Sequence, residues 1–163
     1  MNEKPETLKQ LASARKKEFK KLAVQLKKWP ERLLDTTVHQ LHAKVFTEID
    51  CLQCASCCRY LGPRIANQDI TKMAKALHIS ASEFFDTYLR TDEDGDMVFK
   101  TMPCPFLMSD NYCSIYESRP KACKEYPHTN RKRFYQIIDL SLKNIPICPA
   151  VYKIFDELSK TKK

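Results

Sequence analysis

Apolar residues recur at helical spacing through the first fifty positions of this 163-residue chain. One stripe lies within residues 6–28, is interrupted by Arg15, and contains Leu8, Leu11, Phe19, Leu22 and Leu26. A second stripe follows Pro30, within residues 31–48, and contains Leu34, Val38, Leu41 and Val45. These repeats predict two amphipathic helices that form a helical hairpin. We expect the hairpin to cover the cysteine site described below or to bind a protein partner, including a second copy of the chain.

Two shorter helices are predicted in the next part of the chain. Asn67 or Asp69 can cap the first, because a side-chain oxygen just before an apolar helical pattern accepts a backbone N–H group. Ser80 followed by Glu83 has the spacing of a capping box. This pair predicts the start of the second helix, which extends to Leu89.

A polar turn at residues 91–96 separates these helices from a short predicted strand at residues 97–99. Residues 112–116 have the composition of a partner strand, so we expect one small hairpin-like sheet. The turn has four acidic residues around Gly95, but it lacks the spacing and the terminal glutamate of an EF-hand loop. It is therefore interpreted as a solvated turn.

The C-terminal third contains further helix signals. Ser118 is predicted to cap a helix that has Pro120 in its first turn and carries Cys123. Residues 134–142 are apolar and fit either a strand or a helix. Pro149 opens a last helix, whose apolar positions are Val151, Ile154, Phe155 and Leu158.

The predicted fold is mainly α with a small β element, a small α+β chain whose irregular middle is organised around metal. Three segments are expected. Residues 1–48 form the N-terminal amphipathic helices, and residues 49–152 form a cysteine-cluster metal-binding domain. Residues 153–163 form the end of the last helix and a tail.

Composition excludes some classes of function. The chain has two glycines, whereas a P-loop or a dinucleotide-binding turn needs several at fixed spacing. No stretch approaches the roughly 18 consecutive apolar residues of a membrane span, so we expect no membrane contact. The N-terminus has no signal-peptide pattern. We expect a cytoplasmic protein of bacterial type, in which eight cysteines indicate metal or redox chemistry before disulfides.

The cysteines are concentrated in one stretch of eight residues. Cys51, Cys54 and Cys57 repeat the Cys-x-x-Cys spacing, which lets thiolates face one metal centre, and Cys58 follows directly. The other four are spread downstream, at Cys104, Cys113, Cys123 and Cys148. The overlapping Cys-x-x-Cys pairs are also how the bacterial ferredoxin motif begins, and that motif ends in a remote cysteine followed by proline. Cys104 and Cys148 both precede a proline.

All-sulfur ligation favours zinc or an iron–sulfur cluster over magnesium, calcium or manganese. Adjacent side chains diverge, so Cys57 and Cys58 cannot easily bind one zinc ion. They could serve two centres, or two iron atoms of one cluster. Eight thiolates also divide into two zinc sites of four each. The sequence leaves zinc and iron–sulfur open, with a slight preference for a four-iron cluster.

The cysteine pattern resembles the CxxCxxCC cysteine-cluster family, also called the YkgJ family of zinc- or iron-chelating domains. The resemblance covers residues 49–152 and is carried by Cys51-x-x-Cys54-x-x-Cys57-Cys58, Cys104-Pro105-Phe106-Leu107, Cys113-Ser114-Ile115-Tyr116-Glu117-Ser118-Arg119-Pro120, Cys123, Tyr126-Pro127 and Cys148. It implies that all eight cysteines belong to the metal-binding set. The cluster is also similar to that of the flagellin lysine methylase, which implies an iron–sulfur centre. Lys124 departs from the family, which more often has arginine there.

Three other residues near the cysteines could support a metal centre. Arg119, one turn before Cys123, could donate hydrogen bonds that tune a metal-bound thiolate, or pair with Glu117. Tyr116 and Tyr126 could shield the centre, although core packing also explains them. The histidines are interpreted as surface or structural residues, and they are His39, His42, His78 and His128.

The sequence allows two further functions beside metal binding. A cluster-dependent enzyme or accessory factor in group transfer, such as protein lysine methylation, is implied only by the partial resemblance. Nucleic-acid binding with a structural zinc could use residues 131–133 and the lysine-rich first helix. The formal net charge is +8, but two tetrathiolate zinc centres would lower it to about +4, which weakens this alternative.

Overall fold

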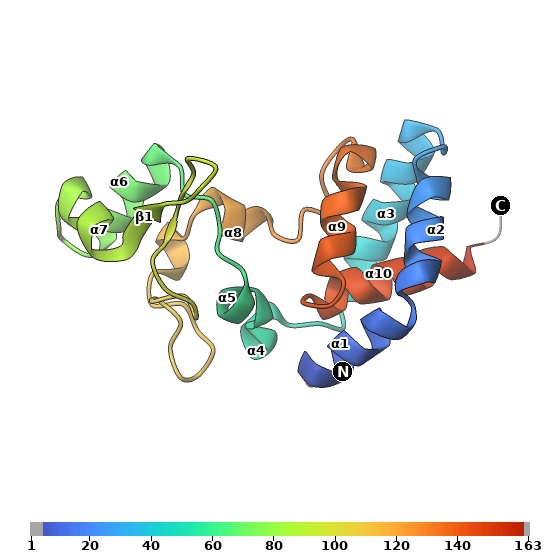
Figure 1. Cartoon of the computed structure of the whole chain (residues 1–163), viewed down its shortest axis with the longest axis horizontal. Helices are drawn as coiled ribbons and strands as arrows, with labels where there is room; N and C mark the ends of the chain where they lie inside the picture. The colour runs from blue at the N-terminus through green and yellow to red at the C-terminus, as the bar shows by residue number, and fades with distance from the viewer. Residues whose placement is uncertain (1–4, 162–163) are drawn as a thin grey trace. The chain divides into compact units, whose positions relative to one another are not determined.

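The computed structural model describes residues 5–161 and divides into two compact units (Figure 1). The terminal unit comprises the chain up to Cys54 and from Pro127 onward, and the central unit is Ala55–Tyr126. Helices make up most of the described chain, and its sheet has two short strands. The expected fold class, mainly α with a small β element, is confirmed. In residues 5–161 no helix has the length and apolar character needed to cross a membrane.

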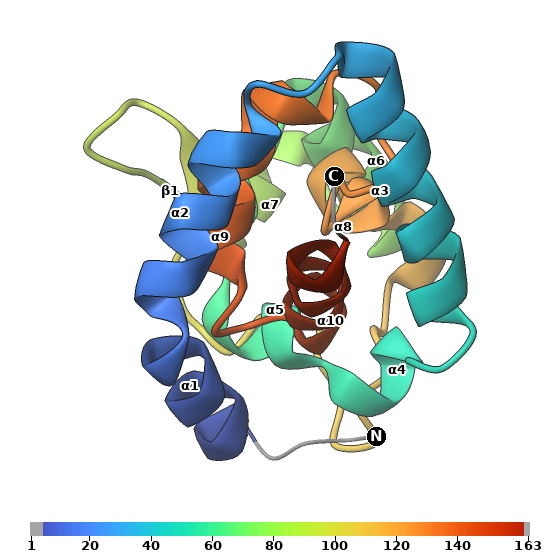
Figure 2. The same ribbon diagram turned by 90° about the vertical axis from the view of Figure 1, so that its right-hand side faces the viewer.

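The terminal unit is a group of helices around α10. Its elements are α1 (Pro5–Ala14), α2 (Lys16–Leu26), α3 (Glu31–Phe46), α4 (Cys51–Cys54), η2 (Phe134–Ile137), α9 (Ile138–Asn144) and α10 (Pro149–Lys160). In Figure 2, α10 lies with α3 on one side and with α2 and α9 on the other, and all three contact it. The last helix is therefore the centre of this unit.

The apolar stripe of α10 explains this position. Its buried residues are Ala150, Val151, Ile154, Phe155 and Leu158. Phe19 of α2 packs edge-on against α10, with ring centroids 6.0 Å from Phe155 and 5.8 Å from Tyr152. The stripe predicted after Pro30 forms α3 and buries Leu34, Val38 and Val45. Burial of such side chains is the main source of stability in a helical unit of this kind.

The single helix predicted over residues 6–28 is wrong at Arg15, where α1 ends and α2 begins. The guanidinium of Arg15 forms ion pairs with Glu18 and with Asp156 of α10, and its Nη2 donates to Ser159 Oγ at 2.9 Å. It also lies 4.5 Å from the centroid of the Phe19 ring. The polar interruption of the stripe therefore joins the N-terminal helices to α10.

The ambiguous residues 134–142 form helix rather than strand. The carboxylate of Asp35 in α3 accepts the backbone N–H groups of Arg133 at 2.7 Å and Phe134 at 2.9 Å. Arg133 has a φ of 58°. Asp35 therefore acts as a helix cap from a distant segment, which no local sequence signal indicates.

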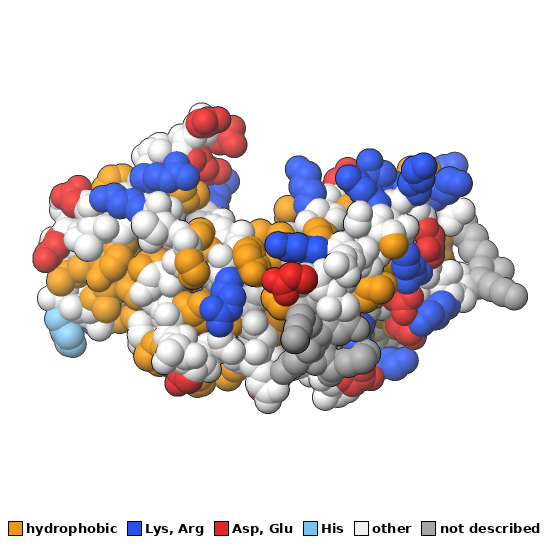
Figure 3. Space-filling model, turned by 60° about the horizontal axis from the view of Figure 1, so that its bottom comes forward, with side chains coloured by type: hydrophobic (Ala, Val, Ile, Leu, Met, Phe, Trp, Pro, Cys, Tyr) orange, Lys and Arg blue, Asp and Glu red, His pale blue; other side chains and the backbone are white. Residues whose placement is uncertain are grey.

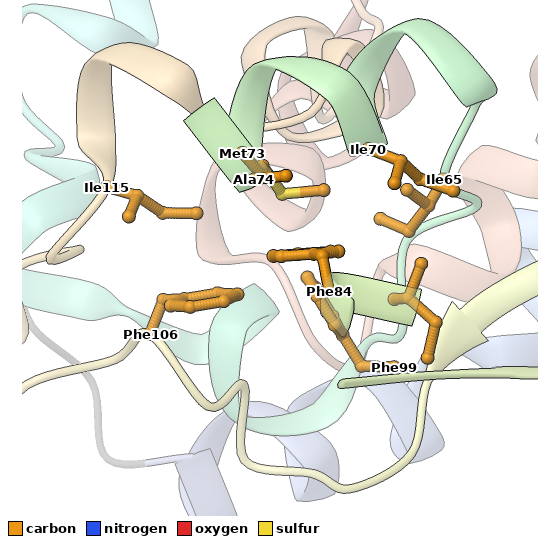
Figure 4. Packing of buried hydrophobic residues seen from close by; sticks show 9 residues of the cluster. Ile65, Ile70, Met73, Ala74, Phe84, Phe99, Phe106 and Ile115 are labelled. Atoms are coloured by element: carbon orange, nitrogen blue, oxygen red, sulfur yellow. The ribbon is translucent and has the colours of Figure 1, made fainter. Parts of the chain in front are cut away.

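The central unit is built around a cluster of buried apolar residues (Figure 4). Its elements are α5 (Ser56–Tyr60), α6 (Asn67–Ala76), α7 (Ala81–Tyr88), β1 (Leu89–Thr91), β2 (Met97–Phe99), η1 (Tyr116–Ser118) and α8 (Lys121–Glu125). The cluster contains Ile65, Ile70, Met73, Ala74, Phe84, Leu89, Phe99, Phe106 and Ile115. The rings of Phe84 and Phe106 are nearly parallel, with centroids 6.0 Å apart.

The capping predictions are partly confirmed. Ser80 Oγ accepts the Glu83 backbone N–H at 3.1 Å, as the capping-box spacing predicts. Asp69 lies inside α6 rather than before it, and its carboxylate accepts N–H groups from Ala66 at 3.2 Å and from Lys121 at 3.1 Å. The second bond caps α8. Ser118, predicted to cap that helix, instead ends η1.

The predicted partner strand at residues 112–116 is wrong. The strand β2 pairs with β1 in antiparallel register, with Leu89 opposite Phe99. Leu89 was expected in the preceding helix, but α7 ends at Tyr88 and the chain passes directly into β1. The segment around Cys113 forms a single bridge to Leu107. Leu89 is buried in the cluster, opposite Phe99.

The two units differ in their surfaces on the face shown in Figure 3. Lysine and arginine side chains gather on the terminal unit, whereas hydrophobic side chains gather on the central unit. The exposed large hydrophobic residues of the central unit are Tyr60, Met102, Met108 and Tyr112. The lysines of α2 are exposed, as expected for the polar face of an amphipathic helix.

Candidate metal centre

Four cysteines of the central unit lie in one neighbourhood, and they are Cys58, Cys104, Cys113 and Cys123. The charge of Cys58 raises the pKa of each of the other three, and Cys104 and Cys113 act on Cys123 in the same way. Electrostatic interaction weakens with distance, so this mutual influence indicates that the thiols are neighbours. In the backbone, the Cys104 N–H donates to the Cys58 carbonyl at 2.8 Å.

The loop that carries Cys104 and Cys113 is fixed by buried side chains. A turn closes where the Leu107 N–H donates to the Cys104 carbonyl at 3.0 Å, and Phe106 in that turn is buried in the cluster. Leu107 then pairs with Cys113 across the isolated bridge. Ile115, two residues later, is also buried. The two cysteines therefore flank a short loop whose base is part of the core.

Cys123 belongs to α8, a helix of five residues. The Cys123 N–H donates to the Pro120 carbonyl at 3.0 Å, and the N–H of Lys121 donates to Asp69 of α6. The carboxylate of Asp69 is buried. Asp69 therefore joins α6 to α8 and holds Cys123 beside the core.

Burial is the main cause of the raised pKa of three of these thiols. It raises the pKa of Cys104 to about 11 and that of Cys123 to about 12, and it raises the pKa of Cys113 as well. Cys58 differs, because a hydrogen bond from Cys57 lowers its pKa to about 7. The Sγ atoms of Cys57 and Cys58 lie 4.0 Å apart. Cys58 is thus the thiol of this group that ionises nearest to neutral pH.

The terminal unit has three further cysteines. Cys51 and Cys54 begin and end α4, and Cys148 immediately precedes α10. Burial raises the pKa of Cys148 to about 12, and the charges of Cys51 and Cys54 act in the same direction. Cys148 is buried, Cys54 half-buried and Cys51 exposed.

The eight predicted ligands are thus distributed over two neighbourhoods, with Cys57 beside Cys58. Within residues 5–161, no three histidine, cysteine, aspartate or glutamate side chains are already arranged to hold a metal ion. The thiols are neighbours that must move closer to share one ion. Metal binding would therefore be coupled to local rearrangement, as in many small metal-binding domains.

A sequence profile described as "Putative zinc- or iron-chelating domain" matches residues 50–141. The chain belongs to the CxxCxxCC family. This match confirms the resemblance expected from the cysteine spacing. The family region contains seven of the eight cysteines, and Cys148 lies beyond it. Neither the curated proteins nor the solved structures contain a match to this chain.

The donor set fits the chelating role of the CxxCxxCC family. Thiolates are soft ligands that select zinc, copper(I) or iron–sulfur clusters over the hard cations that prefer oxygen. Two histidines of the terminal unit form other contacts. His39 Nε2 lies 2.8 Å from the Arg131 carbonyl, and His42 Nδ1 lies 2.7 Å from Thr129 Oγ1. The structural interpretation of these two histidines is therefore confirmed.

Arg119 lies beside the four-cysteine neighbourhood. Its charge opposes the rise in the pKa of both Cys113 and Cys123. The guanidinium lies 3.7 Å from the centroid of the Tyr116 ring, and its Nη1 donates to the Tyr116 carbonyl at 2.7 Å. Tyr126 is half-buried just after α8. The supporting roles suggested for Arg119, Tyr116 and Tyr126 remain predictions.

Sequence reasoning missed Arg59. Its positive charge lowers the pKa of Cys58, and its guanidinium donates to the side-chain oxygen of Asn111. Asn111 has a φ of 68° in the loop before Cys113. Arg59 therefore joins α5 to the loop that carries the later cysteines. A basic residue directly after the run of four cysteines was the available signal.

Proposed function

We propose that the protein binds a thiophilic metal through cysteine thiolates, with Cys58, Cys104, Cys113 and Cys123 as the principal centre. The supporting observation is that four thiols from three segments, α5, the loop that carries Cys104 and Cys113, and α8, influence one another electrostatically within one compact unit. When they ionise, neighbouring thiolates repel one another, and a shared metal cation would offset this repulsion.

Four thiolates suit two kinds of metal centre. Zinc in structural sites is bound tetrahedrally by four such ligands. A four-iron cluster is also held by four cysteine thiolates. Membership of a family of zinc- or iron-chelating domains is consistent with both. A four-thiolate centre also accounts for Cys58 and leaves Cys57 outside, which agrees with the divergence of adjacent side chains.

Bound metal would first of all stabilise the fold of the central unit. The central unit has a modest apolar core, and units of this size gain little stability from burial alone. Bound metal would neutralise part of the charge of the thiolates and cross-link α5, the loop after Cys104, and α8. An iron–sulfur centre would add the capacity to transfer electrons, whereas zinc would not.

Serine variants test this assignment. We expect C104S and C123S to lose the metal of the central unit, because serine does not replace a thiolate ligand for a soft metal. S114A is a matched control at an exposed position beside Cys113 and should retain full metal content. Zinc, iron and acid-labile sulfide are measured per chain after anaerobic purification. Unchanged metal in both cysteine variants would exclude the proposed centre.

Group transfer, nucleic-acid binding and a protein partner remain predictions from the sequence. Group transfer, including lysine methylation, would require a substrate site in addition to the metal. Nucleic-acid binding would use the exposed lysines of α2 and the basic residues 131–133. A protein partner or homodimer would use the N-terminal helices. A cytoplasmic location and a bacterial origin are likewise predictions from the sequence.

A further inference from the structure

We infer that the terminal unit binds a small phosphate-bearing ligand in a groove between the first turns of α3 and residues 131–133. The groove has a volume of about 530 Å³, within the range of about 300–1,000 Å³ that is typical of small-molecule sites. The lining residues that carry a charge or a ring nitrogen are Glu31, Arg32, Asp35, His39, Lys132 and Arg133. None of the lining residues is a cysteine, so this inference goes beyond metal binding and does not depend on it.

Asp35 and His39 join the two walls of the groove. The Asp35 carboxylate accepts the backbone N–H groups of Arg133 at 2.7 Å and Phe134 at 2.9 Å. One turn further along α3, His39 Nε2 donates to the Arg131 carbonyl at 2.8 Å, because a carbonyl oxygen can only accept. Figure 2 shows the start of α3 beside the segment that leads into α9. Both joining side chains are half-buried, so they form the floor of the groove and hold its walls together.

Three cationic side chains line the groove, and they are Arg32 from α3 and Lys132 and Arg133 from the opposite wall. All three are exposed. Within residues 5–161, Arg32 and Lys132 form no ion pair, so their charges are available to a ligand. A guanidinium offers parallel N–H donors that match two oxygens of a phosphate, and an ammonium adds a compact positive charge. This combination favours a phosphate group over a neutral ligand or a cation.

The N-terminus of α3 adds to the positive potential of the groove. This helix has 16 residues and begins at Glu31. The Leu34 N–H donates to the Pro30 carbonyl at 3.0 Å. The N–H groups of Glu31, Arg32 and Leu33 precede this bond, and Pro30 has no side-chain oxygen that could cap them. A helix start of this kind attracts anions, in the same direction as the cationic side chains.

The two carboxylates of the groove have different roles. Asp35 is committed to the two backbone N–H groups that it accepts. Glu31 is exposed, and its Oε1 lies 3.7 Å from Nε of Arg133. An exposed ion pair at this separation contributes little to stability, so a phosphate can take the place of the Glu31 carboxylate beside Arg133. Glu31 therefore competes with the ligand, and its removal should strengthen binding.

Equilibrium dialysis of the full-length chain against inorganic phosphate and adenosine 5′-monophosphate, at low ionic strength, tests the inference. R32A and K132A should each weaken the binding of both ligands about tenfold, because each variant removes a charged donor. E31Q should strengthen binding, a gain that misfolding cannot produce. K143A is the matched control, since it removes an exposed lysine of α9 outside the groove, and it should bind both ligands as the wild type does.

Three results would refute the inference. The first is a wild-type chain that binds neither ligand. The second is equal weakening by R32A and K143A, which would show attraction by the overall positive charge rather than by the groove. The third is binding of a short single-stranded oligonucleotide without binding of the two small ligands. The metal content of R32A and K132A should equal that of the wild type, so failure of this inference leaves the proposed metal binding intact.

Discussion

The core of the central unit provides a quantitative test, and Phe84 is the most informative position. Phe84 is fully buried, and its ring centroid lies 5.1 Å from that of Tyr88 and 6.0 Å from that of Phe106. Figure 4 shows Phe84 in the middle of the cluster, between Met73 and Phe106. Phe106 is also part of the turn that follows Cys104, so the same core supports both the helices and the cysteine loop.

The change Phe84→Ala should remove about 3–5 kcal/mol from the free energy of unfolding of the central unit. The upper half of this range is expected, because the change also removes aromatic contacts worth about 0.5–1.5 kcal/mol each. Whole domains have about 5–15 kcal/mol in total, and small ones lie at the lower end. Without metal, the F84A variant should therefore be close to unfolding in its central unit.

Urea titration followed by circular dichroism measures this loss, with and without Zn²⁺. Zinc at about 100 times its dissociation constant should restore about 2.7 kcal/mol, because the ion binds the folded unit only. Phe85→Ala is the matched control, since Phe85 is the next residue and only half-buried. The single tryptophan, Trp29, reports on the terminal unit by fluorescence. An F84A midpoint no lower than that of F85A would refute the assignment of the core.

Three further predictions concern the thiols and the ion pairs. C58S should lose the metal of the central unit, because the charge of Cys58 acts on the other three thiols, whereas C57S should retain it, because adjacent side chains diverge. Equal metal content in the two variants would contradict this prediction. Burial raises the pKa of Cys148 from 9.0 to about 12, so its contribution to the stability of the metal-free chain is complete below about pH 9 and is lost as the pH rises through about 12. Thermal melts across this pH range should show the decrease in stability, and the decrease should be smaller in C148S. Arg15→Ala should lower stability by about 1 kcal/mol through loss of its half-buried ion pair with Asp156, and a melting temperature equal to that of the wild type would argue against it.

The sequence predicts the helices better than it predicts their ends. The stripes in residues 31–48 and after Pro149 specify α3 and α10, because a helix must bury such a stripe against another element. The contact that Arg15 makes at the break between α1 and α2 is with Asp156, about 140 positions away in the chain. The cap of α8 by Asp69 likewise comes from another helix. Such contacts join distant segments, so no local pattern reveals them.

The candidate site shows the same limit. Cysteine spacing is enough to predict metal binding and the family, because few other reasons place four thiols within eight residues. Cysteine spacing does not reveal which thiols lie together in the folded chain. The grouping of Cys58 with Cys104, Cys113 and Cys123 depends on the turn anchored by Phe106 and on the position of α8. Both are consequences of the packed core rather than of residue spacing.

The most direct test of metal binding is the metal content of the wild-type chain purified without oxygen, measured together with its absorption spectrum. We expect zinc or iron bound in stoichiometric amounts. Iron should be accompanied by sulfide and by a brown colour with absorption near roughly 400 nm, whereas zinc should leave the protein colourless. A folded protein that contains neither metal would contradict the central claim.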